Sequence, residues 1–269
     1  AGADPGGELA IPVAPEQQAD LAEVLVFILI GLVVVAVGRL GGRAVLGLIF
    51  FNQALEPGGK PQIQLAHGAG IFARRADQWV LDLPAESAAG APPHQIEYTR
   101  TLFGGPRQWL GTDRGLAWRP VVDGKPLGEW QAFEDPLLAD FGFVRLLATI
   151  EGGHEELWAL GFGAGLVRIR DDGIRAWRAR TGELPTESIY SMRSTRGPSG
   201  ERWLWVASRA GLLRLRGDEV QVFDRRHGLP SDAVRNVEVQ RGTDGPDILW
   251  LATEGGIVRA TRAEKPLFS

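Results

Sequence analysis

Seven side chains that can bind ligands or transfer protons lie in turns and connections of a repeated sequence. They are His67, Asp113, Arg114, Arg209, His227, Asp232 and Glu254. Imidazole and carboxylate groups ligate metal ions and transfer protons, and guanidinium groups bind anions. If the two ends of the repeated region meet, the two histidines, Asp232 and Glu254 cluster, and such a cluster suits a metal ion or an acid–base pair.

The same residue types also occur in turns that have no chemical role, because Asp, Glu, Arg and Gly are common in any surface loop. The sequence has no nucleophile elbow, phosphate loop, HExxH or CxxC motif, and it contains no cysteine. We therefore predict that the seven residues bind a ligand or a partner. We predict no catalytic residue, no metal ion and no cofactor.

A phrase that occurs five times determines where these residues lie. It consists of a short apolar run, a turn, and Gly followed by Leu or Ile, and its glycines are Gly70, Gly115, Gly165, Gly211 and Gly256. The steps between these glycines are 45, 50, 46 and 45 residues. This period is typical of β-propellers, and the apolar runs and turns of each copy predict four short antiparallel strands.

Other residues recur with the glycine and are predicted to be part of the scaffold. A tryptophan precedes the glycine by six or seven residues in four copies, as Trp109, Trp158, Trp205 and Trp250, and Gln64 takes its place in the first. We interpret these rings as packing between neighbouring sheets, since they return at one position. We interpret the recurring arginines as a solvated strand face. They are Arg74, Arg119, Arg168, Arg214 and Arg259.

The fold class predicted is all-β, a propeller of about five and at most six four-stranded blades. The five blades cover 44–83, 95–133, 142–178, 188–223 and 234–269. The last blade lacks a full fourth strand, so that strand is either short or supplied by residues 8–14. In such a fold, the turns between second and third strands and the connections between blades share one face, which is where the seven residues are expected.

The repeated phrase resembles the two-component regulator propeller repeat. Residues 109–116 and 250–257 carry it most clearly, and the connection HisGlyLeuProSerAspAlaVal at 227–234 adds to it. The resemblance covers about 44–269, and the copies at 62–71 and 158–166 depart from the pattern. It implies a sensor-type propeller of the kind found outside the cytoplasm in hybrid histidine kinases and diguanylate cyclases. No kinase or cyclase sequence follows in this chain.

The first 43 residues differ from the rest. Residues 1–20 read as an extended leader, and 24–38 form an unbroken run of fifteen residues without a polar side chain. With its flanks, this run approaches the roughly 20 residues of a membrane-spanning helix, so we predict such a helix over 21–40. The alternative is a sixth, partial blade with strands near 24–29 and 33–37. Arg39 and Arg43 favour a cytoplasmic propeller, whereas the family resemblance favours the opposite side.

These observations lead to two hypotheses about function. The first is a non-catalytic, single-pass membrane-anchored propeller that recognises a ligand or another protein, either as a sensory module or as an accessory subunit of a membrane complex. The second is a propeller enzyme, similar to lyases or lactonases, that uses loop histidines and carboxylates. The net charge of −4 and the scattered basic residues give no reason to expect nucleic acid.

Overall fold

The protein is built from five antiparallel sheets that follow one another along the chain. A computed structural model describes residues 22–25, 34–40, 43–55, 61–67, 70–75, 78–84, 90–139, 141–161, 163–197, 199–242, 247–261 and 267–268. Three sheets have four strands, one has five and the first has six. The expectation of an all-β chain of antiparallel sheets is confirmed, and the sheets are consistent with propeller blades.

Each sheet takes its strands from a continuous stretch of chain. The first contains β1 (Ala22–Leu25), β2 (Val34–Leu40), β3 (Arg43–Leu55), β4 (Pro61–His67), β5 (Gly70–Arg75) and β6 (Gln78–Pro84). The second contains β7 (Pro93–Thr99), β8 (Arg107–Thr112), β9 (Gly115–Val122), β10 (Lys125–Pro126) and β11 (Gln131–Phe133). The third contains β12 (Phe143–Glu151), β13 (His154–Gly161), β14 (Gly165–Arg170) and β15 (Gly173–Trp177). The fourth contains β16 (Ile189–Arg196), β17 (Arg202–Ser208), β18 (Gly211–Arg216) and β19 (Glu219–Phe223). The fifth contains β20 (Val234–Gln240), β21 (Ile248–Thr253), β22 (Gly256–Thr261) and β23 (Leu267–Phe268). Among the described residues, three short 3₁₀ helices lie between strands, η2 (Leu102–Gly104), η3 (Pro136–Leu138) and η4 (Arg225–His227).

The recurring glycines open β5 of the first sheet and the third strand of each later sheet. All five have positive φ angles, including 117° at Gly165 and 122° at Gly211. A Cβ atom on Gly211 would also lie 2.3 Å from the carbonyl oxygen of Phe223 on the neighbouring strand. The positive φ angle therefore favours glycine at this point in every copy, and the lack of space adds to it at Gly165 and Gly211.

The recurring tryptophans pack between sheets, as the sequence predicts, in three of the four cases. Trp109, Trp158 and Trp205 are 0%, 3% and 0% exposed, and each belongs to an apolar cluster that includes residues of the following sheet. Trp250 of the fifth sheet is 39% exposed, and Ile257 beside it is 69% exposed. No further sheet covers this face in the described part of the chain, so the side chains that would be wedged between blades face solvent.

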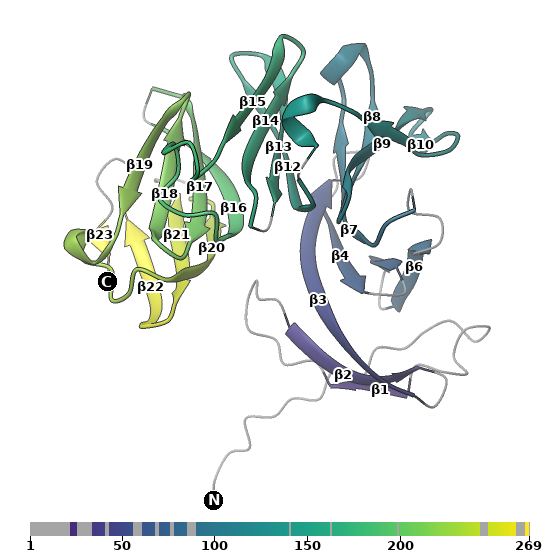
Figure 1. Cartoon of the computed structure of the whole chain (residues 1–269), viewed down its shortest axis with the longest axis horizontal. Helices are drawn as coiled ribbons and strands as arrows, with labels where there is room; N and C mark the ends of the chain where they lie inside the picture. Colours follow the sequence, from purple (N-terminus) through teal and green to yellow (C-terminus); the bar gives the residue numbers. More distant parts are fainter. Residues whose placement is uncertain are drawn as a thin grey trace, which may run out of the picture.

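Figure 1 shows the sheets arranged along an arc, with β3, β7, β12, β16 and β20 on the inside of the curve. These innermost strands contact one another in sequence, β3 with β7, β7 with β12, β12 with β16, and β16 with β20. Within the described residues, β20 and β3 form no comparable contact that would close a ring. The fourth strand of the last sheet is β23, which pairs with β22 at Thr261↔Leu267, while residues 8–14 lie outside the described residues.

The helix predicted over 21–40 is wrong for the residues that the structure describes. β1 and β2 pair as antiparallel strands at Ala22↔Arg39 and Leu25↔Val37, and β2 continues onto the first half of β3. Residues 26–33 and the leader at 1–20 lie outside the described residues. The β-branched residues of β2 favour a strand, and pairing with β3 satisfies its backbone groups.

These N-terminal strands do not form a separate sixth blade either. They extend the first sheet, because the long strand β3 pairs with β2 through Ile49 and with β4 from Phe50 onward (Figure 1). In the described ranges, no helix has both the length and the hydropathy to cross a bilayer.

Three of the recurring arginines, Arg119, Arg168 and Arg214, are half-buried and thus more enclosed than the predicted solvated face, whereas Arg259 is exposed. The Arg168 side chain is 13% exposed, and its guanidinium lies 5.7 Å from the Trp158 ring centroid and 5.4 Å from that of Trp177. Arg214 lies 4.4 Å from the Trp203 ring in the same way. A guanidinium stacks readily on an aromatic face, so an inter-sheet tryptophan offers arginine a partner that solvent does not.

Candidate functional site

Most of the seven residues predicted to bind lie at one end of the sheets. Backbone hydrogen bonds tie the turn between second and third strands to the residue just before the innermost strand. The N–H groups of Asp113, Arg209 and Glu254 donate to the carbonyl oxygens of Pro92, Ser188 and Ala233, over 3.4, 2.9 and 3.1 Å. This repeated bond shows that the turns and the inter-sheet connections share one end of the second, fourth and fifth sheets.

The side chains at this end contact near neighbours and do not converge on one point. Asp113 Oδ1 lies 2.5 Å from His94 Nε2, and Glu254 forms an ion pair with Arg235. The Arg114 N–H donates to Thr112 Oγ1 over 3.2 Å within its own turn. Each of these contacts stabilises one turn. His67 ends β4, and its side chain lies outside the described residues.

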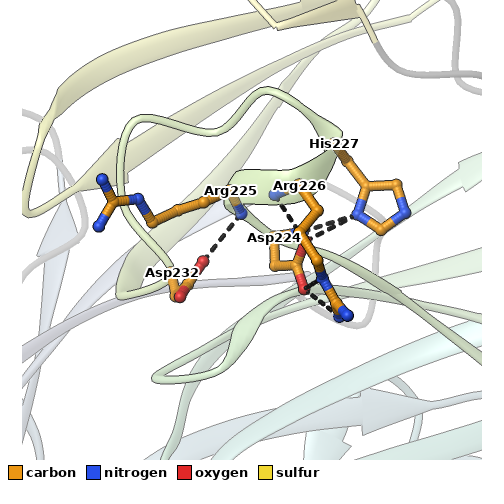
Figure 2. A network of polar contacts seen from close by, with 5 residues as sticks. All are labelled: Asp224, Arg225, Arg226, His227 and Asp232. Atoms are coloured by element: carbon orange, nitrogen blue, oxygen red, sulfur yellow. Dashed lines mark hydrogen bonds and ion pairs between the residues drawn. The ribbon is translucent and has the colours of Figure 1, made fainter.

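The connection that contains His227 and Asp232 is a polar network of its own, shown in Figure 2. Asp224 Oδ2 accepts from Arg226 Nε over 2.9 Å, Asp224 Oδ1 accepts from the Arg226 N–H over 2.9 Å, and His227 Nδ1 lies 2.9 Å from the same Oδ1. Asp232 Oδ1 accepts from the Arg225 N–H over 2.8 Å. Hydrogen bonds from Arg226, with a smaller contribution from His227, hold the pKa of Asp224 well below its usual range.

These contacts give His227 and Asp232 a role in holding the loop around η4. The predicted meeting of His67, His227, Asp232 and Glu254 is not seen for the three whose side chains are described, since each contacts a different neighbour. In the described ranges, no group of three or more His, Asp or Glu residues has the arrangement needed to hold a metal ion. Whether the seven residues bind a ligand or partner stays a prediction.

A cavity of about 800 Å³ lies at the opposite end of the sheets. Its walls are the last residues of the innermost strands β7, β12 and β16 and the hairpins that follow them. It is lined by Gln95, Glu97, Tyr98, Thr99, Arg100, Pro106, Val121, Asp123, Gly124, Arg145, Leu146, Leu147, Ala148, Thr149, Ile150, Glu155, Met192, Arg193, Ser194, Arg196, Arg202 and Arg241. None of the seven predicted residues is among them. Its volume is within the range of small-molecule sites, about 300–1,000 Å³.

Buried polar residues occupy one repeated position of the innermost strands, and two of them, Gln95 and Arg145, line the cavity. At one position, twenty residues before the recurring glycine, the four copies from the second onward carry Gln95, Arg145, Ser191 and Asn236, all less than 9% exposed. Gln95 fastens its strand to the next, since its Nε2 donates to the Leu146 carbonyl oxygen and its Oε1 accepts from the Leu146 N–H, both over 2.9 Å. Ser191 Oγ accepts from the Val237 N–H over 3.0 Å in the equivalent place. These bonds fix the wall in a defined position.

A second set of polar residues joins the wall to the buried tryptophans. Trp109 Nε1 donates to Thr99 Oγ1 over 2.9 Å, and Trp205 Nε1 donates to Thr195 Oγ1 over the same distance. In the fifth sheet, Trp250 Nε1 donates to Gln240 Oε1 over 2.9 Å. The rings that pack the sheets therefore also orient the strands that line the cavity.

Charged groups continue the wall between the third, fourth and fifth sheets. Arg193 donates from Nε to Glu238 Oε2 over 2.9 Å and from Nη2 to Oε1 over 2.7 Å, a bidentate pair. Arg145 is 6% exposed. Burial, with a smaller effect of the Arg193 charge, lowers the pKa of Arg145 to about 10, and the Glu238 carboxylate opposes this shift. The guanidinium of Arg145 thus keeps its proton at neutral pH.

The backbone of one rim hairpin is anchored by a carboxylate from the neighbouring sheet. Glu155 Oε2 accepts from the backbone N–H groups of Arg100, Thr101 and Leu102 over 2.7, 2.6 and 3.1 Å. Three donors on one oxygen hold this hairpin against β13, so this part of the rim is ordered before any ligand arrives.

A sequence pattern that was not used for the prediction indicates the polar residues of the innermost strands. Alternate residues of the innermost strands are polar, as in Gln95, Glu97 and Thr99 or Ser191, Arg193 and Thr195, although these strands are buried on both sides. Buried alternating polar residues indicate a lined interior space or strand-to-strand hydrogen bonds. Aligning the copies on the recurring glycine would have found them.

The fold is that of an all-β protein of repeated antiparallel sheets with a polar cavity, and the likeness to one solved structure agrees with this fold. The sequence matches no protein-family profile and no curated protein. Among solved structures, the extracellular domain of the putative one component system BT4673 from B. thetaiotaomicron is similar, with 16% identity and a TM-score of 0.51 over 80% of this chain. This chain spans only 26% of that one. BBS1N in complex with ARL6DN is similar over 86% of this chain and 84% of that one, with 12% identity and a TM-score of 0.47.

Proposed function

We propose that the chain is part of a β-propeller recognition module that binds its ligand without catalysing a reaction. The observation that carries this proposal is the cavity of about 800 Å³ on the inner strands, where two hydrogen bonds join the lining residues Gln95 and Leu146 across neighbouring strands. A site that is ordered in advance loses little conformational freedom when a ligand binds, which favours affinity.

We further propose a sensory role for this module. The fold likeness to the extracellular domain of a putative one component system supports the idea, as does the repeated phrase that resembles the two-component regulator propeller repeat. In a sensor, binding in the cavity would be transmitted to a partner protein. An accessory subunit that docks on a membrane complex is the other form of the same proposal. The side of the membrane stays a prediction.

The test compares the two ends of the sheets with the full chain of 269 residues. Small-molecule libraries are screened by the shift in melting temperature, and each hit is measured by calorimetry. The substitution Ala148→Trp places a bulky side chain at a lining position and should abolish binding of hits to the cavity. Arg114→Ala and Arg209→Ala at the opposite end should leave that binding unchanged.

Two results would contradict the proposal. Hits whose binding survives Ala148→Trp and is lost in Arg114→Ala or Arg209→Ala would place the site at the turn end. Turnover of a hit that disappears in His227→Gln would support the enzyme hypothesis. Circular dichroism of each variant is the control for folding.

A further inference from the structure

The cavity has an excess of positive charge, although the chain as a whole has a net charge of −4. Its lining includes six arginines, Arg100, Arg145, Arg193, Arg196, Arg202 and Arg241. It includes three acidic residues, Glu97, Asp123 and Glu155. The lining thus has a formal charge of +3 (six minus three). Low-dielectric walls lined by one sign of charge concentrate ions of the opposite sign.

Two of these guanidinium groups meet at Ser194 from different sheets. Arg202 donates from Nη1 to Ser194 Oγ over 3.2 Å and from Nη2 to the Ile150 carbonyl oxygen over 2.8 Å. Arg241 donates from Nη2 to the Ser194 carbonyl oxygen over 2.9 Å and pairs with Asp247 at 2.5 Å. The two side chains are held by the scaffold, and both line the cavity.

Arg202 has an unused donor at this point. Its Nε is buried and makes no hydrogen bond with the described residues. A buried N–H without an acceptor is unfavourable, and more so when the group is charged, so an acceptor that reached it would stabilise it. Burial and the charges of Arg196 and Arg241 lower the pKa of Arg202, and Glu151 and Glu156 oppose that shift.

The carboxylates of the lining are partly committed elsewhere. Glu155 Oε2 receives the three N–H groups of the rim hairpin, and Glu97 Oε1 accepts from the Tyr98 N–H over 3.0 Å. Asp123 is exposed on the hairpin between β9 and β10. The region around Arg196, Arg202 and Arg241 holds three of the six lining arginines. Asp247 pairs with Arg241, and Glu151 and Glu156 act on Arg202, so an added anion is attracted to these guanidinium groups in competition with those carboxylates.

We propose that the cavity binds a small molecule with a carboxylate, phosphate or sulfate group, and that Arg202, Arg241 and Arg196 hold this oxyanion. This inference names the ligand class of the site described under Proposed function and rests on it. Arginine suits the task, because its planar donor fork matches two oxyanion oxygens at once. Val121, Leu147 and Met192 give the same cavity an apolar wall, which accommodates an uncharged remainder of the ligand.

The test measures anion binding to the full chain by calorimetry at constant ionic strength. The probes are inorganic phosphate, sulfate and citrate, with sodium chloride as the balancing salt and glycerol as the neutral comparison. We expect at least one of the three anions to bind. The double substitution Arg202→Gln and Arg241→Gln should weaken that binding tenfold or more, because a hydrogen bond to a charged group contributes about 1.5–3 kcal/mol. The three anions distinguish the possible oxyanions.

Matched variants separate the site from a general charge effect and from misfolding. Arg216→Gln removes one positive charge from an exposed position outside the lining and should leave the affinity unchanged. Arg100→Gln removes an exposed lining arginine whose loss disturbs no buried contact, and it should weaken binding about two- to fivefold through Coulomb attraction alone. It thus reports on the site even if the double variant does not fold.

The inference fails if none of the three anions binds, or if binding is the same in the double variant, Arg100→Gln and the parent chain. A third outcome is that neutral compounds bind, that Ala148→Trp abolishes their binding, and that no anion binds. This outcome would contradict the inference of an oxyanion ligand but would support the proposal that the cavity recognises a ligand. If Ala148→Trp changes the binding of no compound, charged or neutral, both the oxyanion inference and the recognition proposal are wrong.

Discussion

Trp205→Ala and Trp250→Ala remove the same side chain from equivalent positions of two sheets, and we expect very different losses of stability. Trp205 is 0% exposed, lies between the fourth and fifth sheets, and donates to the buried Thr195. Removing a fully buried tryptophan leaves a cavity and costs about 3–5 kcal/mol. The Thr195 hydroxyl also loses its donor.

Trp250 is 39% exposed on the uncovered face of the last sheet. Its removal leaves an open surface that water fills, so only the transfer free energy of the buried part is lost, about 1–2 kcal/mol. The difference between the two variants should be about 2–3 kcal/mol by this reasoning.

Urea unfolding at 25 °C, followed by circular dichroism, measures both losses. With an m-value of about 3 kcal/mol per molar urea, the midpoint should fall by more than about 1 M for Trp205→Ala and by roughly half as much or less for Trp250→Ala. Trp109→Ala, also at a 0% exposed position, should match Trp205→Ala. Equal losses for Trp205 and Trp250 would refute the reasoning, because they would mean that another sheet covers Trp250 in solution.

Three further predictions concern the scaffold around the two ends. Gly211→Ala should destabilise the protein by more than about 1 kcal/mol, because the new Cβ meets the Phe223 carbonyl oxygen at a positive φ, whereas Gly105→Ala, in extended backbone with open space, should be neutral in the same urea assay. Glu155→Gln should lower the unfolding free energy by about 1–3 kcal/mol, since one amide oxygen replaces a carboxylate that accepts three N–H groups; an unchanged midpoint would argue against this anchor. Asp224→Asn should destabilise at pH 7 and converge with the parent chain as the pH falls below about 4, because a carboxylate with a lowered pKa contributes stability above its ordinary pKa and loses it on acidification; a gap that stays constant between pH 7 and 3 would exclude that linkage.

The repeat predicted from the sequence agrees closely with the observed strands, because both depend on backbone angles and strand pairing within one copy. The glycine before Leu212 needs a positive φ and an absent side chain, and each apolar run pairs with its neighbour in sequence. Such contacts arise within one copy of the repeat, so they recur wherever the residues recur.

The N-terminal segment shows why hydropathy did not distinguish helix from strand. Residues 24–38 are apolar throughout, a property that suits a bilayer and a buried sheet equally. Only the pairing of Val34–Leu40 with β3 distinguishes them, and this pairing places Arg39 opposite Ala44. A uniformly apolar stretch has no polar–apolar period, so its sequence does not show whether it packs against lipid or against a neighbouring strand.

The cavity at the opposite end of the sheets was not predicted from the sequence, for a similar reason. Histidines and carboxylates in turns are candidates for a site by residue type alone. In the structure, the side chains of Asp113, His227 and Glu254 each contact a neighbouring residue. The lining arginines at the opposite end come from four sheets, and nothing in the local sequence around Arg202 or Arg241 shows that both donate to Ser194.

The sequence by itself determined that the chain is all-β, that its unit is a four-stranded sheet, and which glycines and tryptophans build that unit. Each of these follows from contacts within one period. The tertiary structure alone decided which equivalent residues differ, as Trp250 differs from Trp205, and where charge accumulates, as it does around Ser194. The exposure of a side chain and the clustering of charge both depend on how successive sheets stack. Stacking brings together residues about one period apart, and the sequence pattern within one period does not show which of these residues meet.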